Sequence, residues 1–170
     1  MPVSDQGIFN DRYMLIPRTL IFLTCGERLL LIKGAPTKRL WANLYNGIGG
    51  HIEQGEDVLS AARRELLEET GLACPELRLA ATITVDTGVS PGIGIFVLRG
   101  ELGEAEAAAL RPSPEGTLEW VPVAELSRLP LVEDLPVLLP RLLELQPGDP
   151  PLSARYAYDA AGQMQVIFGT

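Results

Sequence analysis

The sequence has little that would carry it into or across a membrane. No apolar run approaches the ~20 residues that a membrane-spanning helix needs. The longest candidate, residues 20–32, is broken by polar residues and a glycine, which are Thr24, Gly26, Glu27 and Arg28. Residues 1–13 lack a basic segment followed by an apolar one, so we expect no secretory signal. These absences argue against a membrane protein and favour a cytoplasmic one.

Cysteine is also scarce. The chain has two, Cys25 and Cys74, so a disulfide is possible but not implied. Without an export signal, we expect free thiols in a reducing compartment. The 170 residues show no internal repeat and no low-complexity tract. This length suits one domain covering residues 1–170.

An excess of positive charge is missing as well. The 22 acidic residues outnumber the 14 lysines and arginines, which gives a net charge of −8. Proteins that bind nucleic-acid polymers usually carry a basic face that neutralises phosphates, so such a partner is not expected. A small polyanion still fits if metal ions supply the positive charge at the site.

Apolar and β-branched segments predict five strands in the first 123 residues, at 15–24, 29–33, 77–86, 94–102 and 118–123. Two longer helices are expected. Residues 56–69 contain neither Gly nor Pro, and residues 134–145 contain Pro140, which must end or kink that helix. Strands and helices mix without strict alternation, which favours an α/β fold with a mixed sheet between helices.

Two further segments have their own signatures. Residues 103–112 are rich in alanine and glutamate and read as a short exposed helix or a mobile loop. The end of the chain has apolar runs on either side of Asp159-Ala160-Ala161-Gly162, which predicts a terminal β-hairpin at about residues 153–168.

Three glutamates dominate the first predicted helix. Glu65, Glu68 and Glu69 stand at i, i+3 and i+4, so a helix brings them onto one face. Hard oxygen ligands at this density suit Mg²⁺ or Mn²⁺, which leave positions for phosphate oxygens. A solvated acidic face is the alternative, because Arg64 is four residues before Glu68 and pairs part of the charge.

The residues around this helix favour the metal site. They fit the pattern G-x5-E-x7-R-E-U-x-E-E-x-G-U, where U is bulky and apolar, at every specified position between residues 50 and 72: Gly50, Glu56, Arg64, Glu65, Leu66, Glu68, Glu69, Gly71 and Leu72. The chain therefore resembles the Nudix hydrolases, of the MutT and oxidised-purine nucleoside triphosphatase type. The resemblance implies an α/β/α sandwich with a central mixed sheet, a loop–helix–loop at residues 50–72 and a C-terminal β-hairpin.

The same resemblance assigns roles residue by residue. Glu65, Glu68 and Glu69 are expected to bind Mg²⁺ or Mn²⁺, completed by the carbonyl of Gly49. Glu65 is also a candidate base for the attacking water, and Arg64, itself paired with Glu56, is expected to orient Glu65. Metals of this kind neutralise polyphosphate and lower the pKa of bound water, and a nearby carboxylate takes the proton.

Substrate recognition is predicted from residues outside this motif. Asn46, in Asn46-Gly47-Ile48-Gly49-Gly50, resembles the asparagine with which oxidised-purine triphosphatases read the base, although it also suits a turn before glycine. Glu133 and Asp134 take the place of the two aspartates in those enzymes. One of the two is a glutamate here, and both also suit a helix N-terminus.

Other charged residues complete the predicted site. Glu115 stands where MutT-type enzymes carry an extra loop glutamate, so it is a candidate fourth metal ligand or alternative base, or else a surface charge. Lys33 and Lys38 could meet the outer phosphates or be solvated. His51 is the only histidine and is given no catalytic role.

The leading hypothesis is a metal-dependent nucleoside triphosphate diphosphatase, acting on oxidised purine nucleotides such as 8-oxo-dGTP and releasing monophosphate and pyrophosphate. A Nudix hydrolase of ADP-ribose or nucleotide sugars is the alternative, and a non-catalytic nucleotide-sensing module is a more remote one. The expected partner is a small nucleotide, bound by a monomer or a homodimer.

Overall fold

The computed structural model describes residues 2, 6–7 and 11–169 and has one mixed β-sheet at its centre. The strands are β1 (Leu15–Cys25), β2 (Arg28–Gly34), β3 (Tyr45–Asn46), β4 (Arg78–Val85), β5 (Gly92–Glu101), β6 (Gly116–Pro122), β7 (Leu152–Tyr158) and β8 (Met164–Phe168). The helices are α1 (Val58–Thr70), α2 (Glu104–Ala107), a 3-10 helix η2 (Val123–Arg128) and α3 (Leu135–Glu144).

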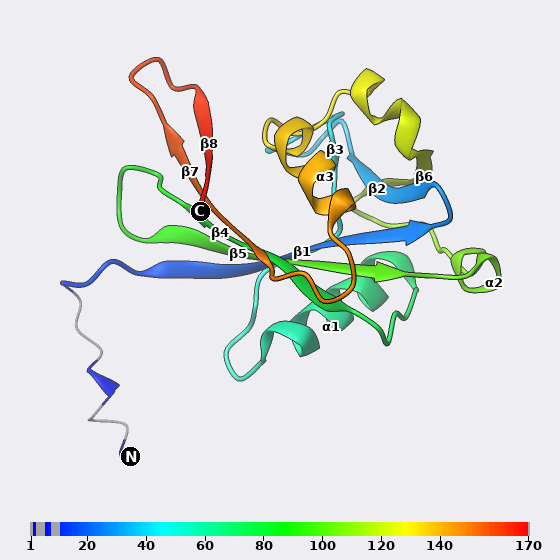
Figure 1. The fold of residues 1–170 in the computed structure, drawn as a ribbon, viewed down its shortest axis with the longest axis horizontal. Helices are drawn as coiled ribbons and strands as arrows, with labels where there is room; N and C mark the ends of the chain where they lie inside the picture. Colours follow the sequence, from blue (N-terminus) through cyan, green and yellow to red (C-terminus); the bar gives the residue numbers. More distant parts are fainter. Residues whose placement is uncertain (1, 3–5, 8–10, 170) are drawn as a thin grey trace.

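The strands follow the order β3-β2-β1-β5-β4-β7-β8, and β6, which is not part of this path, pairs with β2. β1 and β5 are parallel, as are β4 and β7, and the other pairs are antiparallel. The helix α1 lies on one side of the sheet and α3 on the other (Figure 1). We call these sides the α1 face and the α3 face. The predicted α/β/α layers and the mixed sheet are confirmed.

The central strand β1 is apolar because both of its faces are covered. Leu20 and Phe22 point to the α3 face and join a core with the leucines of α3, whereas Ile21 and Leu23 join a second core with Ala62 and Leu66 of α1. All of these side chains are buried. Because successive side chains of β1 point to opposite faces of the sheet, this one strand contributes to both cores.

Most predicted elements appear within one or two residues of their expected bounds. The two-residue strand β3 was not predicted, because it is too short to show a pattern. Pro140 lies inside α3 and does not end it. The buried Leu138, Leu139 and Leu142 hold that helix against the sheet on both sides of the proline. Residues 103–112 contain the short helix α2.

The C-terminal hairpin is confirmed as β7 and β8, and it is also part of the main sheet. β7 pairs in parallel with β4 from Ala81↔Leu152 to Val85↔Tyr156, which extends the sheet past β4. Cys25 and Cys74 are free and buried, in agreement with the expected thiols. Of the helices in the described part of the chain, none combines the length and the hydrophobicity that a bilayer crossing requires.

Candidate active site

The helix α1 begins and ends at well-formed caps. The Asp57 carboxylate accepts hydrogen bonds from the backbone N–H groups of Leu59, at 2.9 Å, and Ser60, at 3.0 Å. Gly71 closes the helix in the left-handed conformation, with φ 72°, which glycine adopts without steric cost. The caps fix the limits of the helix and therefore the positions of the three glutamates along it.

A glycine loop runs alongside β1 in front of this helix. The N–H of Thr19 donates to the carbonyl of Gly50 at 2.8 Å, and Ile21 and Ile48 exchange two backbone hydrogen bonds. A side chain at Gly50 would overlap the carboxylate of Glu65. A Cβ at position 50 would therefore displace the Glu65 carboxylate from the position in which Arg64 holds it.

Arg64 is the centre of a charged network on α1. Its guanidinium donates to both oxygens of Glu56, at 2.7 and 2.9 Å, and to Glu65 at 2.9 Å. It also reaches Glu68 at 3.2 Å and the carbonyl of His51 at 3.1 Å. These bonds hold the Glu65 carboxylate in place, and the arginine lowers the pKa of Glu56 to about 2.

Glu69 has a different environment. It is 8% exposed, and its pKa is raised to about 7, chiefly by burial and further by the charges of Glu115 and Glu65. Lys38 and the backbone N–H of Gly49 act in the opposite direction. Three carboxylates from the helix and a distant loop thus create a negative potential next to the glycine loop.

The predicted metal ligands are neighbours but do not form a closed cage. Across residues 2, 6–7 and 11–169, no three acidic, histidine or cysteine side chains converge tightly enough to hold a metal ion. The Glu68 side chain is 60% exposed and bonded to Arg64, whereas Glu69 is buried. The donor set nevertheless fits Mg²⁺ or Mn²⁺, because it consists of hard carboxylate oxygens beside Gly49 and Gly50, which have no side chains.

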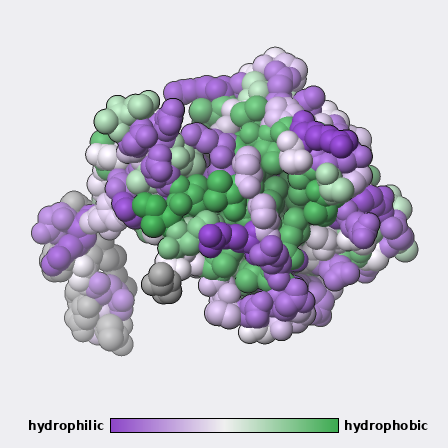
Figure 2. All heavy atoms as spheres, turned by 45° about the horizontal axis from the view of Figure 1, so that its top comes forward, coloured by the Kyte–Doolittle hydropathy of each residue, from purple (hydrophilic) through white to green (hydrophobic). Residues whose placement is uncertain are grey.

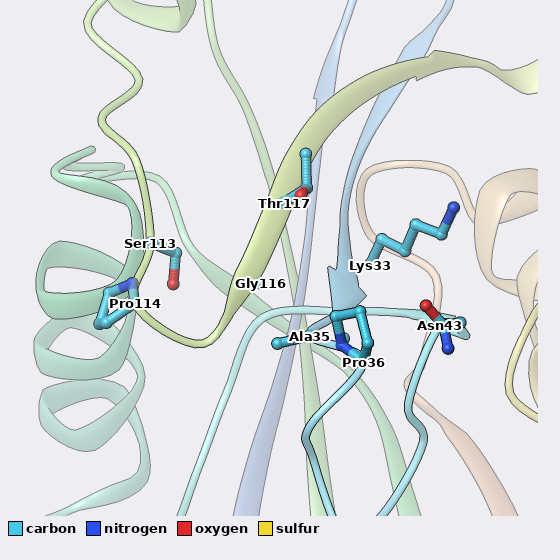
Figure 3. A pocket seen from close by; sticks show the side chains of 9 residues that line it. Lys33, Ala35, Pro36, Asn43, Ser113, Pro114, Gly116 and Thr117 are labelled. Carbon is cyan, nitrogen blue, oxygen red and sulfur yellow. The ribbon is translucent and has the colours of Figure 1, made fainter.

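Glu115 and Lys38 form an ion pair of 2.6 Å at the rim of this cluster. Segments near Lys38 and Glu115 in the sequence line a cavity of about 400 Å³ (Figure 3). Its lining residues are Lys33, Gly34, Ala35, Pro36, Asn43, Ser113, Pro114, Gly116 and Thr117. The ammonium of Lys33 lies 5.5 Å from the centre of the Tyr45 ring. The two predicted phosphate-binding lysines therefore already have partners within the protein.

The predicted base-reading residues come together through the backbone. The N–H of Val132 donates to the carbonyl of Tyr45 at 3.0 Å, which brings Asn46 near Glu133 and Asp134. The Asn46 side chain accepts a bond of 2.8 Å from the N–H of Gly47, as its alternative role in a turn predicts. Asp134 is 7% exposed, and burial raises its pKa.

Two polar side chains that were not singled out from the sequence lie on the α3 face. Arg18 of β1 and Tyr156 of β7 each have a buried polar atom, Nε and the hydroxyl oxygen, without a hydrogen-bond partner. The signal for Arg18 was a charge next to the apolar run of a central strand. Tyr156 gave no signal, because its burial depends on how β7 joins β4.

Comparison with known proteins gives a family match over most of the chain. A family model described as "NUDIX domain" matches residues 14–142. The oxidized purine nucleoside triphosphate hydrolase of Danio rerio is 31% identical over 109 residues, which are 64% of this chain and 67% of that protein. The protein of the same name from Mus musculus is 36% identical over 73 residues, or 43% of this chain and 46% of that protein.

Among solved structures, a MutT protein from Bacillus halodurans has a similar fold. The TM-score is 0.72 at 21% sequence identity, over 91% of this chain and 97% of that one. At this level of identity, the likeness concerns the fold alone.

Proposed function

Because the chain belongs to the Nudix hydrolase family, we propose that it is a divalent-metal-dependent nucleoside triphosphate diphosphatase whose substrate is an oxidised purine nucleotide such as 8-oxo-dGTP. Nudix hydrolases act on small nucleotides and generally use divalent metals. The observation that carries the proposal is the carboxylate of Glu65, which is held by Arg64 at 2.9 Å and lies against Gly50.

The carboxylates of Glu65, Glu68 and Glu69 would hold the metal, with the carbonyl of Gly49 and with Glu115. When bound, a divalent cation neutralises part of the polyphosphate charge and lowers the pKa of a bound water. Support comes from Glu69, whose burial close to Glu65 and Glu115 is unfavourable unless positive charge is near.

The reaction is the hydrolysis of a phosphoanhydride bond. The oxygen of water attacks one of the two phosphorus atoms of the anhydride between the α- and β-phosphates, and its proton goes to a carboxylate. The bond from that phosphorus to the bridging oxygen breaks, which releases monophosphate and pyrophosphate. Glu65 is the first candidate for this base, since Arg64 fixes its orientation. Glu115 is the second, because it faces the same cluster from the loop before β6.

Two independent features support an oxidised purine nucleotide as the substrate. The relatives from Danio rerio and Mus musculus are named for this activity. In addition, Asn46, Glu133 and Asp134 lie near one another across the hydrogen bond between Tyr45 and Val132, so they can bind one base together. To bind the outer phosphates, Lys33 would move away from the Tyr45 ring, and Lys38 would give up its ion pair with Glu115.

A substrate panel with Mg²⁺ tests this function. Oxidised and ordinary dNTPs, ADP-ribose and nucleotide sugars are incubated with the wild type and with Glu68→Gln, and the phosphate products are measured. We expect 8-oxo-dGTP to give monophosphate and pyrophosphate, with kcat/KM at least about 100-fold lower in the variant. Glu125→Gln is the matched control, since Glu125 is exposed on η2, away from α1.

Two results would contradict parts of the proposal separately. Cleavage of ADP-ribose without cleavage of any dNTP would refute the substrate but keep the chemistry. A Glu68→Gln enzyme as active as the wild type on every cleaved substrate would refute the metal site on α1.

A further inference from the structure

Arg18 stands at the centre of the sheet on the α3 face. In the strand register it is next to Ile95 of β5, which pairs with Ile83 of β4, which pairs with Ala154 of β7. Side chains in such a row share one face of the sheet. Tyr156, two residues after Ala154, therefore points to the same side as Arg18.

The surroundings of this row are apolar and partly open. Several side chains pack against the α3-side core while remaining partly exposed, namely Ile93, Ile95, Met164 and Val166. Figure 2 shows hydrophobic residues gathered in the middle of the visible surface with hydrophilic ones around them. A flat apolar group can be buried on such a floor.

The chain before α3 crosses above this floor. Val132 is hydrogen-bonded to Tyr45 of β3, and the Glu133 carboxylate accepts a bond of 3.1 Å from the N–H of Met164 in β8. β3 and β8 are at opposite ends of the strand order, with β2, β1, β5, β4 and β7 between them. The turn at residues 132–134 therefore lies on the α3 face. Asp134 is next to Tyr156, which points to the same side of the sheet as Arg18.

Arg18 and Asp134 nevertheless do not pair. Within the described residues, the guanidinium of Arg18 has no hydrogen bond and no ion pair, and its buried Nε has no partner. The hydroxyl of Tyr156, close to Asp134, is likewise buried without a partner. Leaving buried polar groups without partners is unfavourable, which is a reason to expect a ligand that satisfies them.

We propose that Arg18 is a specificity-determining residue that donates hydrogen bonds to the acceptor edge of a guanine-type base bound between Arg18 and Asp134. The proposal rests on the proposed function, because it takes the ligand to be a nucleotide. It adds the class of base, which is a purine with the O6 carbonyl. The glycine loop runs beside this part of β1, since the backbone N–H of Thr19, the next residue after Arg18, donates to the carbonyl of Gly50.

The donors and acceptors match this base. Guanine offers O6 and N7 as acceptors on one edge, and arginine binds the two together. In 8-oxoguanine N7 carries a hydrogen, so O6 is the acceptor on this edge that the two bases share. Its N1–H and N2–H groups are donors, which the carboxylate of Asp134 can accept. Adenine instead has an amino group where guanine has O6. That donor would face the guanidinium, so adenine is disfavoured.

The test measures binding of dGMP and dAMP, which needs no catalysis, by isothermal titration calorimetry. The wild type is expected to bind dGMP more tightly than dAMP. In Arg18→Met, the affinity for dGMP is expected to fall about 5- to 150-fold, while that for dAMP changes less than about twofold. Arg78→Met, on an exposed arginine of β4, is the matched control and is expected to bind both as the wild type does.

Arg18→Lys separates the charge of the side chain from its hydrogen-bonding geometry. It also replaces Arg18→Met in the test if that variant does not fold. A lysine keeps the charge but loses the planar fork, so the preference for dGMP over dAMP is expected to fall. An equal loss for both nucleotides, no loss, or a wild type without preference overturns the proposal. A protein that binds dGMP through Arg18 but hydrolyses no triphosphate refutes only the proposed function, and hydrolysis with unchanged base preference in Arg18→Met refutes only this inference.

Discussion

On the α1 face, one arginine bonds three glutamates, whereas on the α3 face an arginine and a tyrosine keep buried polar atoms without partners. Arg64 and its acceptors Glu56, Glu65 and Glu68 lie within 13 consecutive residues. Arg18 and Tyr156 are 138 positions apart in the sequence and share a face only through strand pairing. The groups proposed to act on phosphate are thus held by local spacing along the chain, whereas the groups proposed to read the base are brought together by tertiary structure.

The largest expected effect comes from the α1 face. Glu65→Gln keeps the shape of the side chain but removes its charge, so we expect kcat on the cleaved nucleotide to fall about 10²- to 10⁴-fold, with KM changed only a few-fold. Steady-state kinetics of Glu65→Gln and Glu115→Gln measure this side by side. If Glu115→Gln loses more kcat, the base belongs to the loop before β6 and not to α1.

The second effect tests whether the α1 face acts as one network. Arg64→Lys removes the fork that joins Glu56 to Glu65, so kcat is expected to fall about 10- to 100-fold. Glu56→Gln acts on the same network, and the double variant is expected to be hardly slower than Arg64→Lys alone. Effects that multiply would instead mean that Glu56 and Arg64 contribute independently.

The different origins of the two faces explain what could be predicted from the sequence. Spacing along one helix was enough to bring Glu65, Glu68 and Glu69 together, and Gly71 was enough to end that helix. Strand positions were also readable, because apolar runs such as residues 20–23 are long. The sequence could not reveal that β7 pairs with β4, which is the pairing that buries Tyr156.

Side-chain partners were harder to predict than positions. Lys38 was expected near phosphate, and it also forms an ion pair with Glu115, 77 residues away. Asn46 was given two roles, and the local bond to Gly47 is present, while the reading of a base stays a prediction. In both cases the partner of the side chain depends on the tertiary fold or on the rotamer, and the sequence shows no pattern for either of these.

The third effect concerns how α3 is held over its face. The guanidinium of Arg99, on β5, donates to the carbonyl of Leu142 and, at 3.1 Å, to that of Leu145, at the end of α3. We expect Arg99→Met to lower the free energy of unfolding by about 1–3 kcal/mol, measured by urea denaturation. Arg78→Met, the exposed control on β4, is expected to stay within about 0.5 kcal/mol of the wild type. Equal losses in both variants would mean that the α3 carbonyls do not need Arg99.

The smallest effect is a dependence of stability on pH that belongs to the α3 face. Burial raises the pKa of Asp134, and the charge of Glu133 adds to this, while its own backbone N–H opposes it. A carboxyl whose pKa is higher in the folded state favours folding in its protonated form. Its contribution is therefore complete below the unfolded value of about 3.9 and is lost as the pH rises through the folded value.

Asp134→Asn cannot ionise and does not lose this contribution. Relative to the wild type, the variant is expected to become more stable as the pH is raised from about 4 to 7. The measurement is the difference in unfolding free energy between the two proteins at each pH, in which the titrations that they share cancel. A difference that is constant with pH, or that falls as the pH rises, would show that Asp134 is not held in a desolvated site, and the contrast between the two faces would then rest on Arg18 and Tyr156 alone.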